Sequence, residues 1–343
     1  MRGPKLRLLL ALAAVMLTNA AANAEHPIPE AQRWATITHP ANPFYPPPLG
    51  SQYPYPPGRV DYEYQISRTE TTASEWLEFV RACAPYVSAS EAESTVFTST
   101  SIVLNQVSPG VFEYQLRLPE LAERPVTMGW RFAARYCNWL HNNRGSAREA
   151  FEHGVYETST FGGTSQSGFT DQRVRSPGAT YFIPTIDEWV KAVYWDSEQS
   201  HPEIGEQGYW LYPDSSNTPL IAGPPGVGQT SAGGWTAFAL PVASYPDVQS
   251  PWGLWDASGG AREWLETAVI DSSDRMFSRY VKGSFTGSGN LSVNDHIDQL
   301  LASSPIVTTG LRIARIVPTP SAALVFGLFG IAGAGCRSRR QML

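Results

Sequence analysis

The stretch SPWGLWDASGGAREWL, Ser250–Leu265, combines three tryptophans, three glycines and two carboxylates within sixteen residues. Glycine permits tight turns and positive φ angles because it carries no Cβ. Tryptophan is too large and too apolar to remain in water, so we expect Trp252, Trp255 and Trp264 to anchor the segment against a core. The pattern predicts a short, sharply bent segment held in place by aromatic side chains.

Two acidic residues, Asp256 and Glu263, flank the bend, and the backbone carbonyls of Gly259 and Ala261 lie between them. Calcium prefers several oxygen ligands, typically carboxylates combined with backbone carbonyls. We therefore predict a structural Ca²⁺ ion held by Asp256, Gly259, Ala261 and Glu263. The alternative is that the two carboxylates accept hydrogen bonds from loop N–H groups without an ion.

Two helix starts are marked by capping boxes, in which a threonine hydroxyl and a glutamate carboxylate satisfy each other's backbone N–H groups. The first box is formed by Thr72 and Glu75, and the second by Thr185 and Glu188. Asp187 and Glu188 resemble a catalytic carboxylate pair, but a helix start accounts for both residues and is our interpretation. Glu70 precedes the first box and is expected to fix the turn into the helix, with a functional role as the alternative.

Alternating apolar residues predict strands at Asp61–Ile66 and Gly110–Leu118, and a short strand is expected at Trp34–Ile37. Residues 88–110 are rich in serine and threonine and are expected to form a loop. Residues 142–178 are weakly patterned, and residues 196–250 are expected to be a long loop region. The predicted fold class is therefore α+β, with much irregular structure, short antiparallel sheets and two or three helices.

The stretch Ser250–Leu265 resembles the G-L-x-D-x-x-G-N-x-x-E-W signature of the sulfatase-modifying factor family, also called formylglycine-generating-enzyme-like. Further segments resemble the family's other motifs in the family's order: Glu70–Thr72, Arg124–Leu140, Tyr181–Trp189, Tyr280–Phe285 and Gly310–Arg315. The resemblance covers residues 61–316 and implies a fold related to the C-type lectins. Fold alone does not set function, so the chemistry must be argued from residues.

Oxidising members of this family use two cysteines between the motifs that Tyr280–Phe285 and Gly310–Arg315 resemble, and those cysteines bind copper. In this chain the interval from Phe285 to Gly310 contains no cysteine, and Ser292 stands roughly where one thiol is expected. A serine hydroxyl cannot replace a soft thiolate as a ligand for Cu(I). We therefore expect the conversion of a sulfatase cysteine to formylglycine to be absent.

Two hypotheses follow for the function. The first is a surface-displayed binding or structural module that has lost the redox chemistry of the family. The second is an enzyme of the same family with altered, non-copper chemistry in the same cleft. Its candidate catalytic residues are His296, Asp295 and Ser292. The two hypotheses differ in whether these side chains converge in a pocket.

Both ends of the chain have the pattern of processing signals. Residues 1–24 combine basic residues, an apolar run and an Ala-Asn-Ala site, as in a secretory signal peptide. Residues 25–60 form a proline-rich segment, which we expect to pack over the domain surface. Residues 317–343 resemble the PEP-CTERM sorting tail of exported bacterial proteins, with a proline motif, an apolar run and a basic cluster. The chain is thus expected to be exported, and to be membrane-anchored through this tail until a sorting protease cleaves it.

The formal net charge of −6 and the lack of a basic patch argue against nucleic acid as a partner. The expected partner is instead an unknown extracellular ligand or a component of the cell envelope. Cysteine occurs only at positions 83, 137 and 336. Cys83 and Cys137 are expected on two helices, and either a disulfide between them or two buried free thiols is compatible with the sequence.

Overall fold

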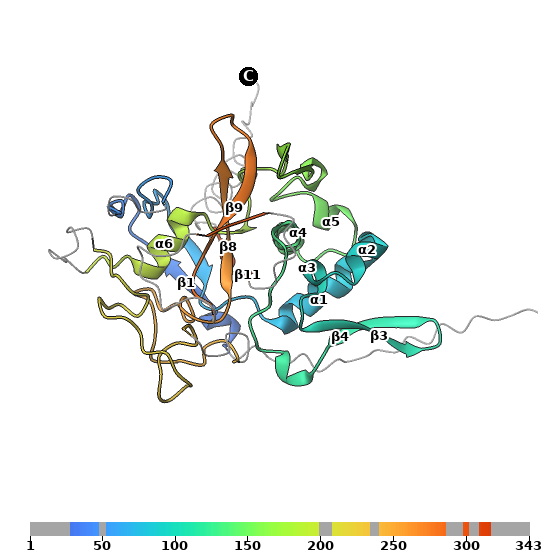
Figure 1. Cartoon of the computed structure of the whole chain (residues 1–343), viewed down its shortest axis with the longest axis horizontal. Coiled ribbons are helices and arrows are strands. Elements are labelled where there is room, and N and C mark those ends of the chain that lie inside the picture. Colours follow the sequence, from blue (N-terminus) through green and yellow to red (C-terminus); the bar gives the residue numbers. More distant parts are fainter. Residues whose placement is uncertain are drawn as a thin grey trace, which may run out of the picture.

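The computed structural model describes residues 28–47, 53–198, 208–233, 240–285, 298–301 and 309–316. The predicted signal peptide and sorting tail, at residues 1–24 and 317–343, lie outside these ranges. Within them the predicted α+β class is confirmed, because short sheets and a few helices are joined by long irregular segments (Figure 1).

A four-stranded antiparallel sheet joins segments from both ends of the domain, in the order β1-β2-β12-β7. Ala314 pairs with Ile66 on one side and with Phe182 on the other. The proline-rich N-terminal segment contributes a strand to this sheet, and the strand predicted at Asp61–Ile66 begins three residues later than expected. The strands are β1 (Trp34–Ile37), β2 (Tyr64–Ser67), β7 (Tyr181–Phe182) and β12 (Ala314–Arg315).

A larger sheet has the order β11-β8-β9-β6-β5, with β10 paired to β9. Its centre is the antiparallel pair β8 (Arg262–Ile270) and β9 (Met276–Lys282). Strand β11 runs parallel to β8 and places Gly310 opposite Glu263, so the closing segment of the domain lies beside the start of β8. The other strands are β5 (Gly163–Thr164), β6 (Gly168–Phe169), β10 (Asp298–Leu300) and β11 (Thr309–Gly310).

Both predicted capping boxes are present and open the helices α1 (Ala73–Cys83) and α6 (Ile186–Tyr194). The third long helix, α4 (Trp130–His141), begins after Gly129 without a side-chain cap. In the described part of the chain, no helix is both long and apolar enough to cross a membrane. The short helices are α2 (Ala89–Ala92), α3 (Thr95–Thr98) and α5 (Glu149–Glu152), with 3₁₀ turns at Glu30–Gln32, Ala84–Tyr86, Pro119–Leu121 and Thr158–Thr160.

An aromatic cluster fills the core between α1 and α4, which lie on the same side of the molecule (Figure 1). The Tyr136 ring lies 5.2 Å from the Trp76 ring and 5.4 Å from the Phe79 ring. All three side chains are buried, and aromatic pairs at such separations stabilise a core beyond the area they bury. These two helices therefore form a rigid support on one side of the sheets.

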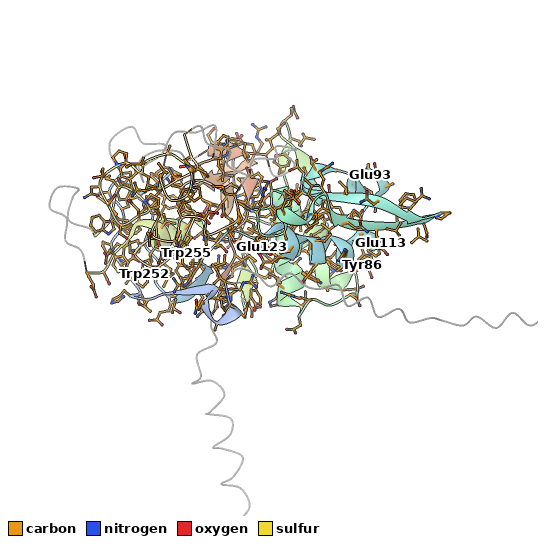
Figure 2. The ribbon with its side chains drawn as sticks, turned by 90° about the horizontal axis from the view of Figure 1, so that it is seen from below. Tyr86, Glu93, Glu113, Glu123, Trp252 and Trp255 are labelled. Atoms are coloured by element: carbon orange, nitrogen blue, oxygen red, sulfur yellow. The ribbon has the colours of Figure 1, made fainter. Side chains whose placement is uncertain are left out.

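The prediction of a loop at residues 88–110 is wrong, because this segment forms α2, α3 and strand β3 (Ile102–Ser108). Ser88 and Glu91 form a third capping box, which opens α2. Strand β3 pairs with β4 (Val111–Leu116) in a two-stranded hairpin that projects from the body (Figures 1 and 2). The apolar face expected for β4 packs on the core only in part. Tyr114 is buried, but Phe112 is 57% exposed.

Candidate functional site

The segment between Ser250 and Ala261 turns sharply, as its glycines predict. Gly259 and Gly260 have φ angles of +105° and +61°, and Asp256 also has a positive φ of 59°. A Cβ on Gly260 would lie 2.1 Å from a carboxylate oxygen of Glu70, and one on Gly259 would lie 2.6 Å from the Ser231 hydroxyl. Glycine is required at both positions because the loop packs directly on these polar groups.

The three tryptophans hold the segment in place, as expected. Trp264 is fully buried, and its indole N–H donates to the backbone carbonyl of Met128 at 2.7 Å. Trp252 and Trp255 are partly buried and donate to the carbonyls of Trp195 and Pro246. Both lie in the part of the molecule away from the β3–β4 hairpin (Figure 2).

At the start of β8, Glu263 forms a fully buried ion pair with Arg312. The guanidinium Nε and Nη2 atoms of Arg312 lie 3.0 Å and 2.9 Å from the same carboxylate oxygen. The other oxygen accepts a hydrogen bond from the indole of Trp189. Arg312 also donates to the carbonyls of Trp255 and Ser67, so its side chain ties the loop to both sheets.

Glu70 lies beneath the same loop. One of its carboxylate oxygens accepts from the Ala261 N–H at 2.8 Å, so the side chain holds this loop rather than the turn into α1 that the sequence led us to expect. The other oxygen is buried and has no hydrogen-bond partner among the described residues. Burial, followed by the negative charge of Asp256, raises the pKa of Glu70 well above its usual value.

Asp256 completes a buried acidic cluster with Glu70 and Glu263. It accepts a hydrogen bond from the Ala243 N–H at 2.5 Å, and burial raises its pKa to about 6. Three carboxylates thus share one guanidinium, that of Arg312, and an uncompensated buried charge is unfavourable. A cation bound at the unpartnered oxygen of Glu70 would relieve this repulsion, and protonation of Glu70, whose pKa is raised, would relieve it without an ion.

The donors for such a cation must include backbone oxygens. Among the described residues, no three His, Cys, Asp or Glu side chains are grouped so that they could hold a metal ion. The carbonyl oxygens of Ala257 and Ala261 both face Gly283, at 3.6 Å and 3.9 Å from the position a Cβ would take there. Because Arg312 and Trp189 occupy the carboxylate of Glu263, that residue would have to share its oxygens with the ion.

The predicted catalytic residues Ser292, Asp295 and His296 lie outside the described residues. Cys83 on α1 and Cys137 on α4 are both buried free thiols in this structure. Burial raises the pKa of Cys83 to about 12 and that of Cys137 well above its usual value. Neither cysteine is therefore a ready source of a reactive thiolate.

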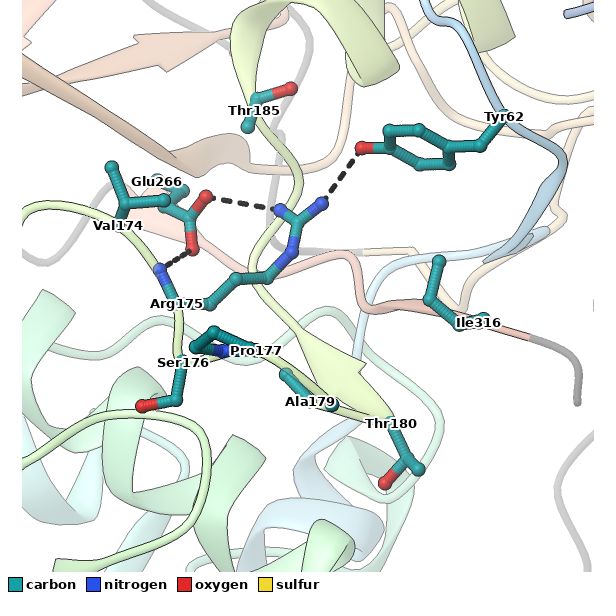
Figure 3. A pocket seen from close by; sticks show the side chains of 11 residues that line it. Tyr62, Val174, Arg175, Ser176, Pro177, Ala179, Thr180, Thr185, Glu266 and Ile316 are labelled. Atoms are coloured by element: carbon teal, nitrogen blue, oxygen red, sulfur yellow. Dashed lines mark hydrogen bonds and ion pairs between the residues drawn. The ribbon is translucent and has the colours of Figure 1, made fainter.

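Sequence reasoning missed a second buried ionic cluster, which is centred on Arg175. The guanidinium of Arg175 lies 2.8 Å from Glu188. It also lies 3.0 Å from Glu266, and its Nη2 donates to the Tyr62 hydroxyl (Figure 3). Glu188 was expected only to cap α6, which it does. The sequence around Arg175 carries no pattern that indicates these partners.

The model of the sulfatase-modifying factor enzyme 1-like domain family matches residues 50–317 of the chain. Among solved structures, CarF superposes with a TM-score of 0.51 at 17% identity, over 83% of this chain and 98% of that chain. Treponema denticola variable protein 1 matches with a TM-score of 0.45 at 14% identity, over 83% of this chain and 95% of that chain. PvdO from Pseudomonas aeruginosa gives a TM-score of 0.44 at 16% identity, over 83% of this chain and 94% of that chain. Among curated proteins, none matches the chain.

Proposed function

Since this chain belongs to the family of sulfatase-modifying factor enzyme 1-like domains, we propose that it is an exported member that binds a ligand or supports the cell envelope. On this proposal the copper-dependent conversion of cysteine to formylglycine is lost. The observation that carries the proposal is the distribution of cysteine, because the chain has only three and none lies between Phe285 and Gly310.

The two cysteines that the structure describes do not substitute for a copper-binding pair. Cys83 and Cys137 are buried in the helical side of the core, and their raised pKa values keep them as thiols at neutral pH. Cu(I) prefers thiolate and thioether sulfur. The third cysteine, Cys336, lies in the predicted sorting tail.

Calcium supports the fold on this proposal, with Asp256, Glu263 and the carbonyls of Gly259 and Ala261 as ligands. The ion would offset the excess negative charge of the acidic cluster and hold the loop against β8. Its role is structural, because the cluster is buried and Arg312 ties it to both sheets. The proposed partner is therefore bound elsewhere on the molecule.

Export is supported by the order of features at the two ends of the sequence. Residues 1–24 would direct secretion, and residues 317–343 would anchor the chain until a sorting protease removes the tail. Cell fractionation with an antibody to the domain tests this directly, with protease treatment of intact cells as the measure of display. Retention of the full-length chain in the cytoplasm would contradict the proposal.

Titration with Cu(I) tests the loss of redox chemistry. The titration is done with the full chain carrying Cys336→Ser, in competition with a Cu(I) chelator. We expect this chain to bind no Cu(I) as tightly as a pair of thiolates would. Stoichiometric binding that survives Cys83→Ser and Cys137→Ser would show ligands that the sequence does not reveal, and it would overturn the proposal.

A further inference from the structure

A pocket of about 690 Å³ opens beside the Arg175 cluster (Figure 3), and none of Glu70, Asp256 and Glu263 lines it. Its size is within the range of small-molecule sites in proteins. Most of its wall is apolar and is formed by Val174, Pro177, Ala179 and Ile316. Tyr62, 39% exposed, places an aromatic ring beside it, and Arg175 and Glu266 provide a polar floor.

The floor is a fixed hydrogen-bonded network. Arg175 Nη1 donates to Glu266 at 3.0 Å and to Glu188 at 3.3 Å, while Nη2 donates to Glu188 and to the Tyr62 hydroxyl. The Phe182 ring covers one face of this guanidinium, with the central carbon 3.7 Å from the ring centroid. The four Nη hydrogens of Arg175 are thus already used, so an anion that contacted both Nη groups would have to displace existing hydrogen bonds.

The floor of the pocket can still accept a hydrogen bond, at the carboxylate of Glu266. One oxygen of Glu266 accepts from the Arg175 N–H and the Tyr156 hydroxyl, whereas among the described residues the other accepts only from Arg175 Nη1. A carboxylate oxygen has two lone pairs, so this second oxygen can accept once more. Glu266 is only 1% exposed, so its carboxylate is held in a fixed position at the bottom of the pocket and is not a mobile surface charge.

The charges around the floor are balanced. Arg279 lies behind Glu266, fully buried, and donates to the backbone carbonyls of Glu266, Arg173 and Gln172. With Arg175 and Arg279 opposite Glu188 and Glu266, the cluster has no net charge to be offset by a ligand. A charged ligand would lose its hydration in this apolar pocket without gaining a counter-ion.

We propose that this pocket is a binding site for a neutral, largely apolar ring compound that carries a hydroxyl group. The rings pack on the apolar wall and on Tyr62, and the hydroxyl donates to the free position of Glu266. This inference rests on the binding role proposed above and names the ligand class for it.

Four naphthalene probes of similar shape test the ligand class by isothermal titration with the full chain. They are 2-naphthol, 2-methoxynaphthalene, naphthalene-2-sulfonate and 2-naphthylmethylammonium. We expect 2-naphthol to bind most tightly, and the methoxy compound to bind about fivefold more weakly because it lacks the donor. The anion and the cation are expected to bind at least about tenfold more weakly than 2-naphthol. Equal affinity for all four probes, or no binding of 2-naphthol, would overturn the inference.

Two variants at the pocket and one control outside it locate the binding. Ala179→Phe fills the pocket and should abolish 2-naphthol binding, whereas Val227→Phe adds the same ring at a position that is 79% exposed outside the pocket and should not. Val174→Glu changes a residue that is 65% exposed, so it does not endanger folding, and it places a negative charge at the pocket. It should shift the preference towards the ammonium probe. Unchanged binding in Ala179→Phe and Val174→Glu would contradict the site.

The titration is independent of the copper experiment. Failure of every probe would remove this ligand class and leave the proposed loss of cysteine oxidation untouched. Copper binding in the chain would overturn the proposed function and would not alter the probe affinities.

Discussion

Arg312 and Glu263 lie 49 residues apart in the sequence, and the fold brings them together as a fully buried ion pair. Arg312 lies two residues after Gly310, which pairs with Glu263 at the start of β8. Glu70 and Asp256 add two further carboxylates to the same region. The positive charge of Arg312 is thus shared by the three carboxylates beneath the loop that contains Gly259 and Gly260.

Removing Arg312 is predicted to be strongly destabilising. Arg312→Ala leaves buried carboxylates without their counter-ion, and breaking such a pair costs about 3–5 kcal/mol of unfolding free energy. Urea unfolding of the full chain measures the loss. Arg173→Ala is the control, because its pair with Asp274 is exposed and is worth less than about 1 kcal/mol. Similar losses in the two variants would mean that Arg312 does not compensate the cluster.

Calcium is predicted to stabilise the fold through Asp256. At a concentration of about 100 times the dissociation constant, a bound ligand adds about 2.7 kcal/mol, which corresponds to a rise in Tm of roughly 5–10 °C for a domain of this size. Thermal unfolding with Ca²⁺ and then with a chelator measures the rise. It should disappear in Asp256→Ala and remain in Asp274→Ala, which removes an exposed carboxylate. An equal rise in both variants would place the ion elsewhere.

The pH dependence of stability is predicted to include a contribution from Glu266. Burial, helped by the negative charge of Glu188, raises its pKa from 4.5 to about 6, although Arg175 acts in the opposite direction. The folded state therefore binds this proton more tightly than the unfolded chain, and the associated stability is lost as the pH rises through about 6. Glu266→Gln should reduce the fall in unfolding free energy between about pH 4.5 and pH 6.5. If the unfolding free energies of the variant and the parent changed with pH in the same way, the raised pKa of a buried Glu266 carboxyl would be contradicted.

Thiol labelling is predicted to separate the two states that the sequence leaves open for Cys83 and Cys137. In the chain with Cys336→Ser, a thiol reagent at pH 8 should label neither cysteine in the folded state, because both are buried with raised pKa values. After unfolding without reductant, both should be labelled. Labelling that requires a reductant would establish a disulfide instead.

The local features of the fold were the ones that the sequence could predict. The capping boxes at Thr72 and Thr185 follow from residues three positions apart, and the structure contains both. The box at Ser88 has the same local signal, but the richness in serine and threonine around it led to the incorrect loop prediction. In the hairpin, the alternation at Gly110–Leu118 predicted β4, whereas β3 was missed because most of its residues are not buried and it has no consistent core face.

The candidate site was predicted only in part. The glycines and carboxylates of Ser250–Leu265 lie in one continuous segment, so their juxtaposition can be inferred from sequence. Arg312 and Glu70 reach the same cluster through pairing between distant strands, which no local pattern encodes. The contact of Arg175 with Glu266, 91 residues away, was missed for the same reason.

The most direct test of the lost chemistry is a product assay. The purified full chain is incubated with Cu(I), oxygen and a cysteine peptide from a sulfatase, and the peptide is followed by mass spectrometry beside an oxidising family member as positive control. We predict that the peptide cysteine stays unconverted in this chain while the control produces formylglycine. Copper-dependent formation of formylglycine by this chain would contradict the account, because a sequence without cysteine between Phe285 and Gly310 would then have retained the reaction.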